Sequence, residues 1–343
     1  MRVHANTLYV MSQGASIGRE RETLRVRIEG KTRLRVPLHH LESVVCFGRI
    51  FLTPAVIGLC GERGVGLTYL TPQGRFQARL ERPCHGNVLL RREQYRQSDS
   101  KESALLLARP MIAAKIQNSR ALLLRAARSA QDTEKQSALQ HAAKRMAALL
   151  VELPSQKSLD AARGIEGAAA AAYFKAFGDA VRDASSPFTF GGRTRRPPKD
   201  PINAMLSFAY ALLRHDCDAA LQAVGLDPAV GFLHADRPGR LSLALDLMEE
   251  FRPLLADRII LSLVNRKQVN AKEFTTDPSG SVSMDESARR TLLAAYQARK
   301  RLEVAHPLLK ETVPFGLLPH IQARLLARTL RSDIDAYPAL VLR

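Results

Sequence analysis

Short alternating runs of apolar and polar residues fill the first 90 positions of the chain. Alternation with a period of two and a high content of β-branched residues predict β-strands. Six segments show this pattern: Thr7–Met11, Thr23–Ile28, Arg33–Leu38, Ser43–Phe47, Gly66–Leu70 and Arg75–Leu80. One short helix is expected among them, at Pro54–Gly61. The N-terminal part is therefore predicted to be rich in β-structure.

The pattern changes to helical spacing after a polar stretch near residue 100. Seven Ala- and Leu-rich segments carry polar residues at intervals typical of amphipathic helices: Ser103–Ser129, Lys135–Val151, Ser158–Arg182, Ala204–Arg214, Leu241–Phe251, Ala288–Leu302 and Leu317–Leu330. Strands followed by helices are typical of an α+β protein. We predict a β-rich domain over residues 1–90, a linker over residues 91–101 and a larger all-α domain over residues 102–343.

Two polar loops interrupt the helical part. Ser185–Asp200 combines Pro, Gly and several basic residues, and Thr275–Asp285 carries Asp-Pro and Ser-Gly turn signals. Both are candidates for mobile segments. A basic loop that becomes ordered on nucleic acid and a plain solvated linker are equally consistent with the composition of the first loop.

The charge balance narrows the classes of partner. The 343 residues include 51 Lys and Arg against 33 Asp and Glu, a formal net charge of +18. Such an excess favours a polyanion as partner, with nucleic acid first among polyanions. A GC-rich genome would explain Arg in place of Lys, but it would not explain the excess over acids.

Membrane and secretory classes are not expected. The best apolar run, Ala204–Leu213, is about half of the ~20 residues that a spanning helix needs. The N-terminus lacks the layout of a signal peptide, and no CxxC pair occurs. We therefore expect a cytoplasmic protein with reduced thiols at its four cysteines: Cys46, Cys60, Cys84 and Cys217.

A predicted hairpin gathers arginines on one face. Apolar residues must face apolar residues across the hairpin, and a three-residue loop, Glu29–Lys31, sets Val26 opposite Leu34 and Arg27 opposite Arg33. Four arginines then share a candidate phosphate-binding face: Arg25, Arg27, Arg33 and Arg35. A solvated face, with nearby Glu residues reducing the repulsion, is the alternative.

The scarce acidic residues are candidates for catalysis. Glu166 shares a helical face with alanines, where a carboxylate is costly unless it is paired or binds a metal. Asp246 and Glu249 are spaced i, i+3 on one predicted helix, so they repel unless a cation lies between them. His234 follows an apolar run and precedes a turn. The ordinary alternatives are a salt bridge from Glu166 to Arg163, a structural His234 and an acidic surface patch.

Taken together, these side chains form an O,N,O ligand set. Carboxylates suit Mg²⁺ or Mn²⁺, and an added imidazole favours Mn²⁺. A basic protein with one acidic, His-bearing spot fits a metal-dependent nuclease or integrase. A P-loop is excluded, because Gly30-Lys31-Thr32 lacks the required upstream Gly: position 25 is Arg25.

Long motifs along the chain resemble one known family. They are RGIEGAAAAAYF (163–174), RRPPKDPINAMLSFAYALL (195–213), GFLHADRPGRLSLALDLMEEFRP (231–253) and NRKQV (265–269), together with VPLHHLESVVCFGRIFLTPAVIGLC and GRFQARL in the β-rich part. These motifs occur in the same order as in the CRISPR-associated adaptation integrases, the first of the numbered Cas proteins, and the resemblance covers nearly the whole chain. Within that family the chain most resembles members from type I systems, in particular subtype I-C.

The resemblance implies a fold, an activity and a site. The fold is a β-sandwich-like domain followed by a helical catalytic domain, in a homodimer. The activity is Mg²⁺- or Mn²⁺-dependent cutting and joining of double-stranded and branched DNA, which inserts short fragments into a CRISPR array. The family's metal ligands correspond to Glu166, His234 and Glu249, with Asp246 as an accessory acid. The implied protein partner is the small ferredoxin-like second numbered Cas protein.

The arginines near the acids are candidates for binding DNA phosphates. Arg163, Arg237 and Arg240 flank the acids in sequence, and a salt bridge to those acids is their alternative role. Weaker candidates lie on the basic loop: Arg193, Arg195 and Arg196. Two departures from the family, Ser332 in place of Gly and the ending ALVLR, leave the docking of the C-terminal segment open. A structure-selective repair nuclease and a non-catalytic nucleic-acid-binding scaffold are the alternative functions.

Overall fold

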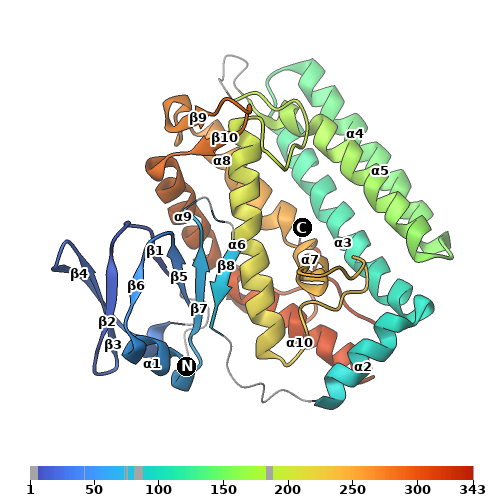
Figure 1. Cartoon of the computed structure of the whole chain (residues 1–343). Coiled ribbons are helices and arrows are strands. Elements are labelled where there is room, and N and C mark those ends of the chain that lie inside the picture. The colour runs from blue at the N-terminus through green and yellow to red at the C-terminus, as the bar shows by residue number, and fades with distance from the viewer. Residues whose placement is uncertain are drawn as a thin grey trace. The chain divides into compact units, whose positions relative to one another are not determined.

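The computed structural model describes residues 7–41, 43–72, 74, 76–80, 88–182 and 188–342. The chain divides into two units, residues 1–85 and 86–343. Strands make up most of the first unit and helices most of the second, so the predicted α+β class is confirmed (Figure 1). Cys84 and residues 185–187 of the basic loop, both named from the sequence, lie outside the described residues.

The first unit contains two four-stranded sheets and a helix. Its elements are β1 (Thr7–Val10), β2 (Ser16–Glu20), β3 (Thr23–Ile28), β4 (Lys31–Pro37), β5 (Ser43–Phe47), β6 (Phe51–Leu52), α1 (Pro54–Arg63), β7 (Gly66–Leu70) and β8 (Phe76–Arg79). The strand orders are β1-β5-β7-β8 and β4-β3-β2-β6. One apolar core takes Val44 and Leu67 from the first sheet, Ile17 and Leu24 from the second, and Leu59 from α1. This shared core is the sandwich-like arrangement that the motifs implied.

The sequence pattern missed two strands of this unit. β2 reads SIGRE and contains only one apolar residue, Ile17, so no alternation is visible there. β6 has only two residues and pairs in parallel with β2. Three strands have the predicted bounds: β3, β5 and β7.

The hairpin of β3 and β4 closes more tightly than predicted. Glu29 and Gly30 both have positive φ, 51° and 74°, which gives a two-residue turn in place of the expected three-residue loop. The predicted pairing of Val26 with Leu34 is confirmed. The register therefore shifts by one residue between the turn and this pair, and a bulge forms in β4.

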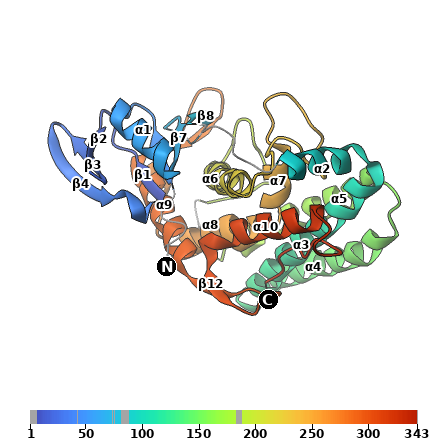
Figure 2. The ribbon, with the colours of Figure 1, turned by 90° about the horizontal axis from the view of Figure 1, so that it is seen from below.

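The second unit is built around long helices. They are α2 (Val88–Asp99), α3 (Lys101–Arg128), α4 (Thr133–Glu152), α5 (Leu159–Phe177), α6 (Pro201–Ala223), α7 (Ser242–Met248), α8 (Arg258–Asn265), α9 (Glu286–Arg301) and α10 (Leu318–Leu330). Helices α3, α4 and α5 pack side by side, and α6 packs against α7 and α10 (Figures 1 and 2). None of the described helices is long and apolar enough to cross a bilayer.

The predicted linker is a helix. Residues 91–101 fall mostly in α2, which belongs to the second unit. The sequence did not predict this helix because one of its buried positions is polar. The side chain of Gln94 is fully buried and forms hydrogen bonds with the main chain of the loop before α7. Its amide donates to the carbonyl oxygens of Asp227 and Val230, each at 2.8 Å. Polar packing of this kind leaves no apolar stripe in the sequence.

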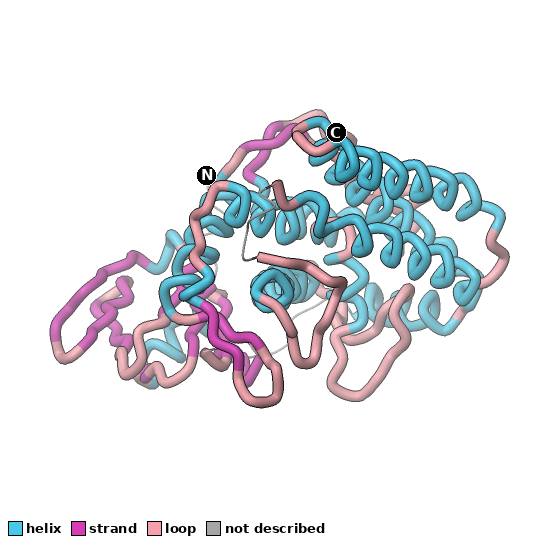
Figure 3. The backbone as a smooth tube through the Cα atoms, turned by 90° about the horizontal axis from the view of Figure 1, so that it is seen from above, coloured by secondary structure: helices cyan, strands magenta, loops and turns pink. Residues whose placement is uncertain are grey.

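The second unit also contains two short antiparallel ribbons, so the all-α expectation needs correcting. They are β9 (Phe274–Thr276) with β10 (Val282–Met284), and β11 (Glu303–Ala305) with β12 (Thr312–Pro314). The first ribbon occupies most of Thr275–Asp285, which was predicted as a mobile loop. Its turn is held by Asp277, whose carboxylate accepts from Ser279 and Ser281. Helices still make up most of the unit (Figure 3).

The helical backbone forms a wider, π-helical turn between α7 and α8. The predicted helix Leu241–Phe251 ends at Met248, and Arg252–Asp257 forms a π-helical turn before α8. Pro253 lacks the amide hydrogen that would continue the α-helical ladder, which is a common cause of such an interruption. The widened turn carries Arg252 and Asp257, both of which contribute to the site described next.

Candidate active site

Three segments that are far apart in sequence supply the candidate ligands. Glu166 lies in the first half of α5, His234 lies in the loop before α7, and Glu249 directly follows α7. The structure brings Glu166 and Glu249 onto a common cation, Lys115 of α3. It places the Nε2 atom of His234 3.9 Å from Oε1 of Glu249. The sequence prediction thus grouped three residues that do lie together.

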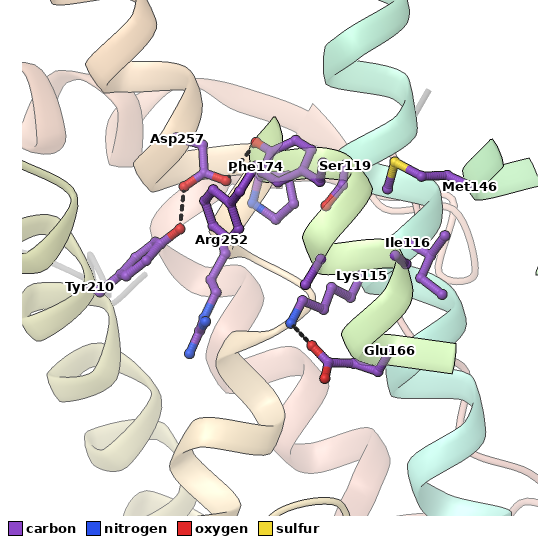
Figure 4. A pocket seen from close by; sticks show the side chains of 13 residues that line it. Lys115, Ile116, Ser119, Met146, Glu166, Phe174, Tyr210, Arg252 and Asp257 are labelled. Atoms are coloured by element: carbon purple, nitrogen blue, oxygen red, sulfur yellow. Dashed lines mark hydrogen bonds and ion pairs between the residues drawn. The ribbon is translucent and has the colours of Figure 1, made fainter. Parts of the chain in front are cut away.

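Lys115 lies between the two glutamates. Its ammonium forms an ion pair with Oε1 of Glu166 and another, at 2.7 Å, with Oε2 of Glu249. Figure 4 shows Lys115 and Glu166 pointing toward one another from neighbouring helices. The Glu249 side chain is 2% exposed and that of Glu166 is 24% exposed, so the cluster opens to solvent on the Glu166 side.

Glu249 carries a second cation. An Nη2 atom of Arg252 lies 3.1 Å from Oε1 of Glu249. Burial alone would raise the pKa of Glu249, but Arg252, Lys115 and His234 together outweigh burial and lower this pKa to about 2. Glu249 is therefore a carboxylate at every physiological pH.

Asp246 is engaged by the loop that carries the histidine. Its buried carboxylate accepts from the backbone N–H groups of Phe232, Leu233 and His234, at 2.6, 2.9 and 2.9 Å. Its Oδ1 atom also lies 2.6 Å from Nδ1 of His234. Gly231 permits this close approach, because a Cβ there would lie 2.9 Å from Oδ2 of Asp246. All four contacts position the loop, and none is directed at Lys115.

The Asp246 contact orients the imidazole. A carboxylate can only accept, so Nδ1 of His234 is the nitrogen that carries the hydrogen. When the imidazole is neutral, its lone pair is therefore on Nε2, the nitrogen 3.9 Å from Oε1 of Glu249, as in a metal-binding histidine backed by a carboxylate. The sequence predicted that Asp246 and Glu249 would lie around one cation. In the structure, Asp246 binds the loop that carries His234, whereas Glu249 binds the cations Lys115 and Arg252.

The residues fit a divalent ion by chemistry, although they are not preassembled for one. Among the described residues, no three His, Cys, Asp or Glu side chains form a ready metal centre. Two carboxylates and one imidazole nitrogen are the right donors for Mg²⁺ or Mn²⁺, and a cation, the Lys115 ammonium, already lies between the carboxylates.

A pocket lies beside the cluster, with Lys115 and Glu166 among its lining residues (Figure 4). Asp257 is buried there and accepts from the hydroxyls of Tyr173 and Tyr210, at 2.7 and 2.6 Å. Burial raises the pKa of Asp257, and the two tyrosine bonds and nearby arginines only partly offset it, so the pKa is about 6. The pocket therefore contains a carboxyl group that titrates near neutral pH.

The arginines next to the acids separate into two groups. Arg163 donates from Nε to the carbonyl of Leu233 at 2.7 Å and pairs with Asp160 at 2.8 Å, so it supports the His234 loop and pairs with a different acid from the one expected. Arg237 is exposed and Arg240 half-buried in the loop after His234. These two side chains remain candidates for phosphate contacts.

The basic loop also divides. Arg193 donates to Asn203 and Ser207 at 2.7 and 3.2 Å, and its guanidinium lies 5.4 Å from the ring centre of Tyr210. It therefore attaches the basic loop to α6 at this position. Arg195 and Arg196 are exposed.

The hairpin arginines form two environments in the first unit. Arg25 and Arg35 face one another and share Glu20, at 3.6 and 3.2 Å, which is the nearby acid that the sequence allowed for. Arg27 and Arg33 are exposed, and the predicted pairing between them is wrong. Arg27 faces Thr32 because Arg33 is the extra residue of the bulge.

The C-terminal segment docks beside the site. Glu250, next to Glu249 in sequence but directed away from Lys115, accepts from the Tyr337 hydroxyl at 2.5 Å and from the Leu340 N–H at 2.6 Å. Asn118 of α3 donates to the carbonyl of Leu340 at 2.8 Å.

Ser332, where Gly was expected, has φ of 61°. A left-handed residue is required there, which is the physical reason to expect Gly.

Sequence reasoning missed Lys115, Arg252 and Asp257. Lys115 gave a weak signal, since it lies one position before Ile116 and four after Met111, both buried residues of α3. A lysine on such a face is worth testing for an acidic partner. No sequence spacing could identify that partner, because Glu166 and Glu249 are 51 and 134 positions away.

Comparison with known proteins agrees with the motifs. The family model described as CRISPR associated protein Cas1 matches residues 8–298. A Chlorobaculum tepidum protein named CRISPR-associated endonuclease Cas1 1 is 45% identical over 343 residues, 100% of both chains. A casposase bound to an integration product superposes with a TM-score of 0.82 at 22% identity, covering 99% of this chain and 95% of the other. A Cas6-RT-Cas1–Cas2 complex gives 0.80 at 21%, covering 98% and 36%.

Proposed function

The chain belongs to the Cas1 family of CRISPR-associated endonucleases and integrases, and from this premise we propose that it inserts short DNA fragments into a CRISPR array by metal-dependent transesterification. In this reaction a DNA 3′-hydroxyl attacks a phosphodiester in line, the P–O bond to the leaving strand breaks, and no ATP is needed. The observation that carries the proposal is that Glu166 and Glu249 share the Lys115 ammonium, with the Nε2 atom of His234 3.9 Å from Oε1 of Glu249.

In this proposal, Glu166, His234 and Glu249 hold Mg²⁺ or Mn²⁺. A divalent ion supplies Lewis-acid stabilisation of the phosphate and lowers the pKa of the attacking hydroxyl. Asp246 keeps Nδ1 of His234 protonated and thereby keeps Nε2 available as a ligand. Arg252 keeps Glu249 ionised within a buried environment. Water in place of the hydroxyl would make the same site a nuclease.

Exposed and half-buried arginines supply the phosphate contacts of this proposal. Arg237 and Arg240 lie three and six positions after His234 and are suited to the phosphates next to the reacting bond. Arg27 and Arg33 on the hairpin, and Arg195 and Arg196 on the basic loop, are suited to other phosphates of the DNA. Arg163, Arg193, Arg25 and Arg35 already have protein partners, so we give them supporting roles.

The proposal includes partners and a compartment. One solved neighbour is part of a complex that contains Cas1 and Cas2. We infer that this chain also works with the small ferredoxin-like Cas2 protein, as a homodimer, in the cytoplasm. The motifs favour subtype I-C within this scheme.

A joining assay separates this function from its alternatives. The substrates are short duplexes with free 3′-hydroxyls and a supercoiled plasmid bearing a repeat array, tested with Mn²⁺, Mg²⁺ or EDTA and with or without the small partner. Metal-dependent joined products are expected. Cleavage without joining, even with the partner, would indicate a structure-selective repair nuclease. Tight binding with no metal-dependent chemistry would indicate a non-catalytic scaffold.

Single substitutions test the assigned ligands. Glu166→Ala or His234→Ala should abolish cutting and joining while salt-sensitive DNA binding largely persists, because binding depends on the basic surface. Glu286→Ala is a matched control, since it removes an exposed carboxylate at the start of α9 and should leave joining unchanged. Loss of DNA binding together with chemistry, in a folded variant, would assign the acids a structural role.

A further inference from the structure

Lys115 lies at the centre of the site but has no role in the proposed reaction. It lies on α3, its side chain is 13% exposed, and its ammonium contacts Glu166 and Glu249. These carboxylates come from two other segments, so Lys115 joins three parts of the unit. An ammonium in contact with both acids holds them at a separation suited to a shared cation.

The charge balance of this cluster disfavours a divalent ion while Lys115 remains. Two carboxylates, Glu166 and Glu249, face two cations, Lys115 and Arg252, and these four charges sum to zero; the further carboxylate of Asp246 is directed at the His234 loop. A divalent ion that approaches a neutral cluster gains little net attraction and meets the Lys115 ammonium at short range. Removal of Lys115 alone would leave one net negative charge and two carboxylates that repel each other.

The two cations are held differently. Arg252 stacks over the ring of Tyr210, with its guanidinium 4.8 Å from the ring centre. This contact holds Arg252 in place independently of its ion pair with Glu249. Among the described residues, the Lys115 ammonium contacts the two glutamates, and Figure 4 shows its contact with Glu166. A flexible lysine that is held only by the ligands themselves can move away when they bind another ion.

We propose that Lys115 is a displaceable counter-ion: its ammonium occupies the cation position between Glu166 and Glu249 in the metal-free protein and must leave when a divalent ion binds. Lys115 is a positioning residue in this role. It offsets the repulsion between the two acids and holds them at a fixed separation before the metal arrives, and it weakens metal binding in return. This inference rests on the proposed function, because it concerns the same metal position.

Mn²⁺ affinity, measured by isothermal titration calorimetry without DNA, tests the inference in the full-length protein. Lys115→Met should bind Mn²⁺ more tightly by about tenfold or more, since the competing charge is gone. Lys115→Arg keeps the charge and should bind close to the wild type. In thermal melts without metal, Lys115→Met should unfold at a lower temperature, and saturating Mn²⁺ should remove most of this difference.

Lys300→Met is the matched control. Lys300 is also buried, at 5% exposed, and lies 3.0 Å from both carboxylate oxygens of Asp216, between α9 and α6. Its loss should lower the melting temperature equally with and without Mn²⁺ and leave the Mn²⁺ affinity unchanged. This control separates general loss of a buried ion pair from loss of a competitor for the metal.

The outcomes distinguish this inference from the proposed function. Equal or weaker Mn²⁺ binding by folded Lys115→Met, with clear binding by the wild type, overturns the counter-ion role and leaves the metal site intact. Binding only by Lys115→Met supports the role and shows a strong competitor. Absence of Mn²⁺ binding in both proteins overturns the counter-ion role and the metal-dependent function together.

Discussion

Asp257→Asn is the substitution whose effect on stability can be derived most directly from the structure. Asp257 ends the π-helical turn, is 1% exposed and accepts hydrogen bonds from Tyr173 and Tyr210. Tyr210 in turn carries Arg252 over its ring, and Arg252 pairs with Glu249. The carboxyl group therefore supports the site through a chain of contacts.

The magnitude follows from the raised pKa. The pKa of Asp257 is about 6 in the folded protein against an ordinary value of 3.8. Between these two pH values the folded protein holds a proton that the unfolded chain has released. The free energy of unfolding therefore falls as pH rises through this window, and the shift corresponds to about 3 kcal/mol. Asn does not titrate, so this loss should be absent in the variant.

The assay is urea unfolding of the wild type and Asp257→Asn between pH 4 and pH 7. The quantity to follow is the difference in unfolding free energy, because contributions from Glu249 and Glu250 are present in both proteins and cancel. This difference should shift in favour of the variant by about 2 kcal/mol between pH 4 and pH 7, most of the full shift of about 3 kcal/mol. Tyr210→Phe is the control: it removes one bond to the carboxylate, so the titration should move to higher pH. A difference that stays constant with pH would refute the reasoning.

Two further substitutions test other parts of the site. Asp246→Asn replaces one carboxylate oxygen, which accepts hydrogen bonds from N–H groups, with an NH₂ group that would face those same donors. We expect the free energy of unfolding to fall by about 2–6 kcal/mol and the joining reaction to be about 10–100-fold slower. Joining at the wild-type rate would contradict the positioning role of Asp246. Ser332→Gly relieves a left-handed residue, φ 61°, and should raise the free energy of unfolding by about 1 kcal/mol in urea titrations without changing joining; a destabilised variant would contradict this explanation.

The fold could be predicted where local pattern and burial agree. β3, β5 and β7 alternate or are apolar throughout, and α3 and α4 carry long helical stripes, so their pattern is unambiguous. Errors arose where polar residues pack inside, as at Gln94 of α2, and where a strand is stabilised by its neighbours, as at β2. Pairing register at the hairpin depended on a turn type that Glu29 gave no reason to expect, since positive φ is rare for this residue.

The candidate site could be predicted only in its acids and histidine. Spacing on α7 correctly brought Asp246 and Glu249 into the same region, but it could not distinguish an acid that binds backbone N–H groups from one that binds cations. That distinction depends on the loop at Gly231, whose fold is set by tertiary contacts. Lys115 could not be assigned for the same reason, because its two partners lie in other helical segments.

The acids of the site are stabilised in different ways, and these differences set what each acid can do. Asp246 accepts three backbone N–H bonds, so its release would unfold the loop that carries His234. Glu249 and Glu166 bind side-chain cations, which can be exchanged without disturbing the main chain. Only these two can therefore pass from an ammonium to a divalent ion. A site built in this way can remain folded without metal, because each of the three carboxylates has a partner in this structure.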